Sequence, residues 1–333
     1  MSTVIKSIFP LGFPWQTQDP FLFCVYHLDH YPEGNEDMTP AASLEGRNLG
    51  NNFTLKDGWR MYHGRTIPGF PSHPHRGFET ITIVNKGFCD HSDSLGAAGR
   101  FGEGDVQWMT AGRGVQHSEM FPLLKTEEKN PLELFQIWLN LPKKSKFVDP
   151  HFAMLWHEDI PIIKTNNSTV KVIAGNYNGI DALNPAPNSW AADDENEVVI
   201  WNIHIDANSS YTLPKANSEV SRTIYFYEGS EIEIESQTIQ VNHGIDLNPL
   251  IDVKINVGSE SAHFLILQGK PISEPVVQHG PFVMNTQEEI RATMKDYGLT
   301  QFGGWPWQHT DNVHAKEKGR FAKYPDGTLV EKS

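Results

Sequence analysis

The chain contains 333 residues with a formal net charge of −14, and its 38% hydrophobic content is typical of soluble globular proteins. This length predicts two domains of roughly 150 residues each. No stretch approaches the ~18 consecutive apolar residues of a membrane span, and the excess of acids disfavours direct binding to nucleic acid or anionic lipid, because such binding depends on neutralising phosphates.

The N-terminal region does not resemble a secretory signal. Its first residues, "MSTVIKSIFPLGFPWQTQDP", contain neither a long apolar run nor a small-residue cleavage site. The only two cysteines are Cys24 and Cys89, so the chain is not a disulfide scaffold, and reduced thiols suit the cytoplasm. We therefore expect a cytoplasmic protein that binds a small molecule or a protein surface.

Short β-type runs dominate the sequence. Clusters of Gly, Pro, Asn and Asp separate them at intervals of about 8 to 12 residues, the pattern of β-sandwiches and barrels. The runs are "FETITIV", "DVQWMT", "LELFQIWLNL", "TVKVIAG", "EVVIWNIHI", "RTIYFYEG", "SEIEIES" and "AHFLILQG". They predict an all-β fold.

The β pattern is interrupted at residues 141–152, "LPKKSKFVDPHF", where proline and charge replace it. Strands resume afterwards with a similar rhythm but without clustered histidines. This rhythm predicts two related β-barrels in tandem, and we place the domains at residues 1–145 and 146–333. The second domain includes the C-terminal helix and tail.

One segment near the C-terminus predicts that helix. In "NTQEEIRATMKDYG", residues 285–298, Thr286 and Glu289 form a capping box at the N-terminal end. Gly298 marks the expected C-terminal end, because glycine readily adopts the left-handed conformation that stops a helix.

Histidines and carboxylates cluster in the first predicted domain. Side chains alternate across a strand, so His73, His75 and Glu79 share a face if "HPHRGFETIT" forms one continuous strand. A second strand-like stretch ends in His117 and Glu119, which also stand two residues apart. Three imidazoles and one or two carboxylates can therefore meet inside a barrel from two strands, which predicts a metal site.

The expected ligands are nitrogen and oxygen atoms without thiolate, which argues against a Cys-rich structural zinc centre. Three imidazoles and one carboxylate leave about two positions of an octahedral ion open, similar to non-haem iron sites. Fe(II) is therefore the first choice, and Mn, Ni, Cu and Zn are alternatives. Six further histidines are assigned to hydrogen-bonded surface positions: His27, His30, His63, His91, His151 and His157.

Long motifs around the histidines carry a family resemblance. "HPHRGFETIT" and "HSDSLGAAGRFGEGDVQWMTAGRGVQHSEM" resemble the signature of the pirin family in the cupin superfamily. "DPFLFCVYHLDHYP", "LELFQIWLNLP" and "GPFVMNTQEEI" resemble other pirin segments. The resemblance implies two cupin barrels of the jelly-roll type, with one iron site in the N-terminal barrel and no metal ligands in the C-terminal barrel.

The resemblance also implies a ligand set. Carried over by motif, the metal ligands would be His73, His75, His117 and Glu119. In most cupins the carboxylate comes from the first motif, where Glu79 stands here. If Glu119 is the ligand, Glu79 would be a neighbouring acid that orients a ligand or substrate.

Some pirins are similar in activity to quercetin 2,3-dioxygenases, which implies a flavonol-like substrate and O2. Glu119 or Glu79 would then be the base for the flavonol 3-hydroxyl. The alternative is an iron-binding protein without catalytic activity that regulates a protein partner. A metal-dependent isomerase or decarboxylase is a third option.

One segment departs from the family pattern. Typical pirins reach the histidine motif over a short connection, whereas residues 33–70 intervene here. Long loops inside compact domains are often functional. Because this segment leads directly into His73, it could cover the barrel mouth and alter which substrates enter.

Overall fold

Strands form most of the regular structure in the computed structural model, which describes residues 3–332. One α-helix, α1 (Gln287–Thr300), is present in this part of the chain. The prediction of an all-β chain with a short C-terminal helix is confirmed. None of the helices within residues 3–332 has the length and apolar character needed to cross a membrane.

The described residues divide into two compact units, which we call unit 1 and unit 2. Unit 1 contains the residues up to Val25, Ile137–Asn140 and Glu158–Ser273. Unit 2 contains Tyr26–Gln136, Leu141–His157 and the residues from Glu274 onward. The expected domain boundary between residues 145 and 146 stays a prediction.

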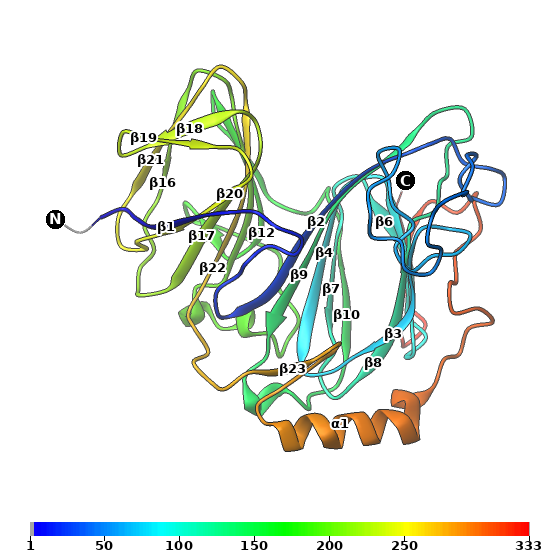
Figure 1. The fold of residues 1–333 in the computed structure, drawn as a ribbon. Helices are drawn as coiled ribbons and strands as arrows, with labels where there is room; N and C mark the ends of the chain where they lie inside the picture. The colour runs from blue at the N-terminus through cyan, green and yellow to red at the C-terminus, as the bar shows by residue number, and fades with distance from the viewer. Residues whose placement is uncertain (1–2, 333) are drawn as a thin grey trace. The chain divides into compact units, whose positions relative to one another are not determined.

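Unit 1 consists mainly of two antiparallel sheets (Figure 1). The two sheets share one apolar core. The larger sheet contains, in spatial order, β1 (Ile5–Pro10), β20 (His243–Leu247), β17 (Ser221–Glu228), β22 (Ala262–Gly269), β15 (Val199–Ile205), β12 (Ser168–Ala174) and β11 (Ile162–Lys164). The smaller sheet contains β16 (Ser210–Leu213), β21 (Val253–Val257), β18 (Glu231–Ile234) and β19 (Gln237–Gln240). Alternate residues of a strand belong to the core, such as Val170 and Val172 of β12 or Ile224 and Phe226 of β17. This alternation explains the period-two pattern of these strands.

Unit 2 is also built around two main sheets. The first contains β10 (His151–Leu155), β7 (Val106–Thr110), β4 (Phe78–Lys86), β9 (Asn130–Asn140) and β2 (Phe21–Tyr31). Of the last two strands, residues 130–136 and 26–31 belong to unit 2. The second contains β26 (Leu329–Lys332), β25 (Arg320–Lys323), β6 (Ala98–Gly102), β5 (Phe88–Asp93), β8 (Val115–Met120) and β3 (Gly69–His75). The C-terminal tail therefore supplies two strands to the sheet that carries the histidines.

The helix α1 begins as predicted and ends later than predicted. The Thr286 side chain accepts a hydrogen bond from the Glu289 backbone N–H, and the Glu289 carboxylate accepts one from the Thr286 backbone N–H, so the capping box is confirmed. Gly298 stays helical, and the left-handed residue that ends the helix is Gln301, with φ 49°. The prediction that the helix stops at Gly298 is therefore wrong.

A sharp break separates β3 from β4 and places them in different sheets. Gly77 lies between them with φ +89°, and a Cβ atom there would lie 2.0 Å from the Val283 carbonyl oxygen. Only glycine fits both the backbone conformation and the space. The premise of one continuous strand through "HPHRGFETIT" is therefore wrong, and the face shared by His73 and His75 does not extend to Glu79.

Candidate metal centre

β3 and β8 bring the predicted ligands opposite one another at the edge of the six-stranded sheet. In this antiparallel pair His73 lies directly across from His117, and Phe70 lies across from Glu119. A register shift between Phe70 and His73 marks a bulge in β3. The hydrogen-bonded strands thus fix the relative position of residues that are far apart in sequence.

Three imidazole rings converge at this strand pair. One nitrogen atom from each of His73, His75 and His117 lies within 4.8 Å of the other two. The Nε2 atoms of His73 and His117 are 3.0 Å apart. Adjacent ligands of a six-coordinate ion are also ~3 Å apart when the metal–nitrogen distances are about 2.1 Å. The spacing of the rings therefore fits a shared metal ion.

The hydrogen bonds of the rings leave nitrogen lone pairs for a cation. Nδ1 of His73 is 2.9 Å from the carbonyl oxygen of Pro71, which can only accept, so a neutral His73 keeps its proton on Nδ1. Its Nε2 then faces His117 as a lone pair. Nδ1 of His117 is buried without a hydrogen-bond partner among residues 3–332, so this atom can hold the proton while Nε2 serves as a ligand.

Burial keeps the three rings neutral. It lowers the pKa of His73 to about 4, and it lowers the pKa of His75 and of His117 well below the ordinary value. The neighbouring imidazoles lower each pKa further, because two positive charges at this spacing repel. Neutral imidazole is the form that binds a metal, so these residues suit a divalent cation.

Glu119 supplies a buried carboxylate beside the rings. Its Oε2 atom lies 3.7 Å from Nε2 of His117, although Glu119 stands outside the tight group of three imidazoles. The Thr82 hydroxyl lies 2.9 Å from Oε1, and the Gln136 amide donates to Oε2 at 3.2 Å. Burial raises the pKa of Glu119, and the bond from Thr82 partly opposes this shift. The arrangement suits a fourth ligand or a base.

The structure does not bring Glu79 to the imidazoles. The Thr110 hydroxyl donates to Oε1 of Glu79 at 2.7 Å, and the Trp108 indole donates to it at 3.3 Å. β4 pairs with β7 without a register shift, so Glu79 and Thr82 lie on opposite faces of β4. Since Thr82 contacts Glu119, Glu79 points away from that carboxylate.

A fourth histidine lies beside the centre and was not predicted there. His91 is fully buried, so its assignment to the surface is wrong. It lies across from Glu119 in the pairing of β5 with β8, and its ring centroid is 5.6 Å from that of His117. The side-chain amide nitrogen of Gln107 donates to Nδ1 of His91 at 2.9 Å. The sequence offers one signal for this position, because His91 is the first residue of the motif "HSDSLGAAGRFGEGDVQWMTAGRGVQHSEM" that carries the family resemblance.

The segment before His73 surrounds Phe70 with aromatic rings. Tyr62 stacks on Phe70 with 5.1 Å between ring centroids, and Phe53 and His63 lie at 6.3 Å and 5.7 Å. Phe70 is in turn 6.3 Å from His73, the partly exposed member of the three imidazoles. An aromatic wall therefore stands next to the centre, and its influence on substrate entry stays a prediction.

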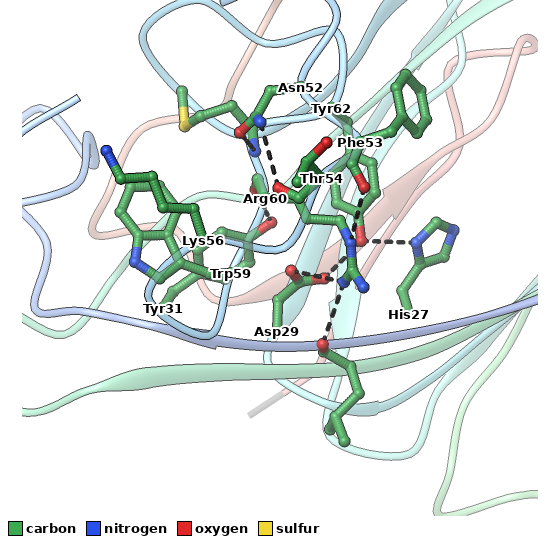
Figure 2. A network of polar contacts seen from close by, with 12 residues as sticks. His27, Asp29, Tyr31, Asn52, Phe53, Thr54, Lys56, Trp59, Arg60 and Tyr62 are labelled. Atoms are coloured by element: carbon green, nitrogen blue, oxygen red, sulfur yellow. Dashed lines mark hydrogen bonds and ion pairs between the residues drawn. The ribbon is translucent and has the colours of Figure 1, made fainter. Parts of the chain in front are cut away.

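Buried hydrogen bonds hold this segment on β2 (Figure 2). The Tyr62 hydroxyl donates to Asp29 at 2.5 Å and accepts from Nδ1 of His27 at 2.8 Å. Arg60 forms an ion pair with Asp29 at 3.2 Å. Burial, and then the positive charge of Arg60, lowers the pKa of His27 to about 3. His27 is 4% exposed, so its assignment to the surface is also wrong.

Comparison with known proteins matches both parts of the chain. Residues 15–139 match the family described as Pirin, and residues 200–303 match the Pirin C-terminal cupin domain. Pirin-1 of Arabidopsis thaliana is 39% identical over 233 residues, which cover 69% of this chain and 76% of that protein. Pirin of Homo sapiens is 35% identical over 242 residues, which cover 71% of this chain and 78% of that protein.

A solved structure extends the likeness to the whole fold. The crystal structure of quercetin 2,3-dioxygenase from Acinetobacter baumannii superposes with a TM-score of 0.68 and 27% identity, and the match covers 90% of this chain and 96% of that one. Both of the named pirins are more than 30% identical to this chain over more than two thirds of its length and of their own. The chain therefore belongs to the pirin family and has its bicupin fold.

Proposed function

We propose that the protein is a metal-dependent dioxygenase that opens the heterocycle of a flavonol, with iron held by His73, His75, His117 and Glu119. The observation that carries the proposal is the convergence of three neutral imidazoles beside a buried carboxylate on β3 and β8. The likeness to quercetin 2,3-dioxygenase over 90% of the chain supports it.

A redox metal bound there would supply Lewis acidity and electron transfer to O2. Glu119 would take the proton of the flavonol 3-hydroxyl, because a raised pKa makes its carboxylate a stronger base, and Thr82 and Gln136 orient it. In the reaction both ring bonds of the carbon that bears the 3-hydroxyl break, and this carbon leaves as CO. The two atoms of O2 bond to its former neighbours, and Glu119 returns the proton to the carboxylate product.

The aromatic wall suits the shape of such a substrate. Phe70 is partly exposed and offers a flat apolar surface next to the exposed side of His73, and the buried Tyr62 ring stacks behind it. A planar flavonol can stack there while its oxygen atoms point toward the imidazoles. Manganese, nickel, copper or zinc could occupy the same donor set, since affinity alone rarely selects the metal.

Oxygen uptake tests the proposal. Protein purified without added metal is analysed for its metal content, loaded with Fe(II) under anaerobic conditions, and mixed with quercetin and O2. We expect uptake well above that of free iron, and its loss in a His75→Ala variant that circular dichroism shows to be folded. Parallel loading with manganese, nickel, copper and zinc ranks the metals.

Uptake that never exceeds that of free iron, with any of these metals, contradicts the proposal. In that case the non-catalytic alternative gains, in which the metal-loaded protein alters the interactions of a protein partner. The net charge of −14 permits such a contact and does not discriminate between the two functions.

A further inference from the structure

Unit 1 contains a cavity of about 580 Å³ at one end of its core. Val199 of β15, Gln268 of β22 and Arg222 of β17 stand side by side across three adjacent strands and line it. Arg222 lies on the same face of β17 as Ile224, a residue of the apolar core, so its side chain points inward. The cavity is within the ~300–1,000 Å³ range of small-molecule sites.

Arg222 is a buried cation without a counter-ion. It is 2% exposed, and its hydrogen bonds go to two neutral oxygens, Oε1 of Gln268 and the Pro214 carbonyl, both at 2.6 Å. No carboxylate in the described chain forms an ion pair with it. Burial lowers the pKa of Arg222 to about 10, and the more distant charge of Glu197 opposes this shift. A buried charge that lacks a partner is costly, so the site favours an incoming anion.

Another buried arginine shows what a purely structural role looks like in the same protein. Arg100 is fully buried in unit 2, and Asp90 accepts from it with both carboxylate oxygens, at 2.7 Å and 2.8 Å. Backbone carbonyls take up further N–H groups of Arg100, among them that of Lys318 at 2.7 Å. The guanidinium of Arg222 has no such carboxylate and borders open space.

Trp201 adds a second donor without an acceptor. Its indole Nε1 is buried and has no hydrogen-bond partner in the described part of the chain, and Trp201 lines the same cavity. The ring is held edge-on against Tyr177, with 5.1 Å between centroids. An unsatisfied buried N–H group costs free energy, which an acceptor oxygen on a ligand would recover. Arg222 and Trp201 together predict a carboxylate group on that ligand.

The remaining charges around the cavity indicate that the ligand also carries a positive group. Four carboxylates line it, and Lys215 is the one cation besides Arg222 among the lining residues. The carboxylates are those of Asp181, Asp193, Asp194 and Glu197. A purely anionic molecule would be repelled by this excess of acids, whereas an ammonium group would be attracted.

We propose that this cavity of unit 1 binds a free α-amino acid, with its carboxylate at Arg222 and Trp201 and its ammonium group toward the acidic lining. This site lies in a different unit from the metal centre and uses none of its residues. Its occupant is defined by chemistry: a small zwitterion whose two charged groups match the two sides of the cavity.

Binding to the full-length protein tests this inference. Each of the twenty standard L-amino acids is screened singly by saturation-transfer NMR, and the strongest binder is measured by calorimetry beside its amide, which lacks the carboxylate, and its des-amino acid, which lacks the ammonium group. We expect at least about tenfold weaker binding for both analogues, because each loses one charged contact.

Variants locate the site. Arg222→Lys removes the planar fork and is expected to weaken binding at least about tenfold, and Trp201→Phe should weaken it about threefold to tenfold by removing one donor. Arg291→Lys, a matched change on the exposed surface of α1, should leave binding unchanged. Trp201→Phe keeps the proposal testable if Arg222→Lys fails to fold, since the indole N–H makes no hydrogen bond that folding needs.

Three results would overturn the inference: none of the twenty amino acids binds, the des-amino acid binds as tightly as the parent, or folded Arg222→Lys and Trp201→Phe proteins bind with unchanged affinity. Oxygen uptake plays no part in these measurements, so the inference stands or falls independently of the proposed dioxygenase.

Discussion

Two buried glutamates in unit 2 have different neighbours and different hydrogen-bond partners. Glu79 accepts hydrogen bonds from Thr110 and Trp108 of the neighbouring strand β7, whereas Glu119 stands beside His117 with Thr82 as a hydrogen-bond partner. The alternation of side chains along a strand allowed either glutamate to face the histidines, so it could not identify which of them is the ligand. The break at Gly77 separates Glu79 from the histidine face. Glycine is needed there because a Cβ atom would collide with the carbonyl oxygen of Val283, a residue far away in the sequence.

Matched substitutions of these two glutamates should separate catalysis from stability. We expect Glu119→Gln to lower the rate of oxygen uptake by about 10²–10⁴-fold, because glutamine keeps the shape but cannot take a proton. Glu79→Gln should retain most of the uptake and lose at most about 1–2 kcal/mol of unfolding free energy, because the amide oxygen of glutamine can still accept from Thr110 and Trp108. Steady-state kinetics and chemical denaturation measure the two effects. Equal losses of activity in both variants would contradict the assignment.

At the scale of strands and helices, sequence patterns predict the type of an element better than its ends or its partners. The run "FETITIV" predicts the strand β4, and the capping box predicts the start of α1. The sequence does not show that α1 continues to Thr300, because Gln301 takes the left-handed conformation expected of glycine. It also gives no sign that β25 pairs with β6, since that contact joins segments far apart in the chain.

The junction between β2 and the inserted segment should be sensitive to acid. The pKa of His27 is about 3 in the folded protein, below the ordinary 6.5. Between pH 6.5 and pH 3 the imidazole is therefore protonated in the unfolded chain and neutral in the folded protein. Stability from neutral His27 is therefore complete above pH 6.5 and declines as the pH falls below it. From pH 7.5 to pH 5.5 this single group should cost about 1.4 kcal/mol of unfolding free energy.

His27→Asn is the matched control for this prediction, because the asparagine amide can still donate to the Tyr62 hydroxyl but does not titrate. Denaturant unfolding at pH 7.5 and 5.5 compares the two proteins. Wild type should lose about 1.4 kcal/mol more unfolding free energy than the variant over this range. Parallel losses in both proteins would show that His27 does not govern the acid response.

At the scale of the whole molecule, composition and rhythm predict two β-rich parts, and the histidine motifs predict which part carries the candidate metal centre. They do not predict how the chain ends are used. Strand β1 near the N-terminus pairs with β20 of unit 1, and β25 and β26 near the C-terminus complete the histidine-bearing sheet of unit 2. Such pairings depend on three-dimensional complementarity between distant segments, which local propensity and parity do not encode.

Because all four proposed ligands lie in unit 2, metal binding should stabilise that unit selectively. A metal that binds only the folded site, at a concentration of about 100 times its Kd, adds about 2.7 kcal/mol to the free energy of opening the site. Amides that exchange only when the site opens should therefore exchange about 100-fold more slowly. Hydrogen exchange with zinc, a redox-inert probe, should show this slowing in β3 and β8, and a chelator should reverse it. Amides of β12 and β15 in unit 1 should change far less. His75→Ala should abolish the effect, and slowing of equal size in both units, or none in β3 and β8, would contradict a centre confined to these strands.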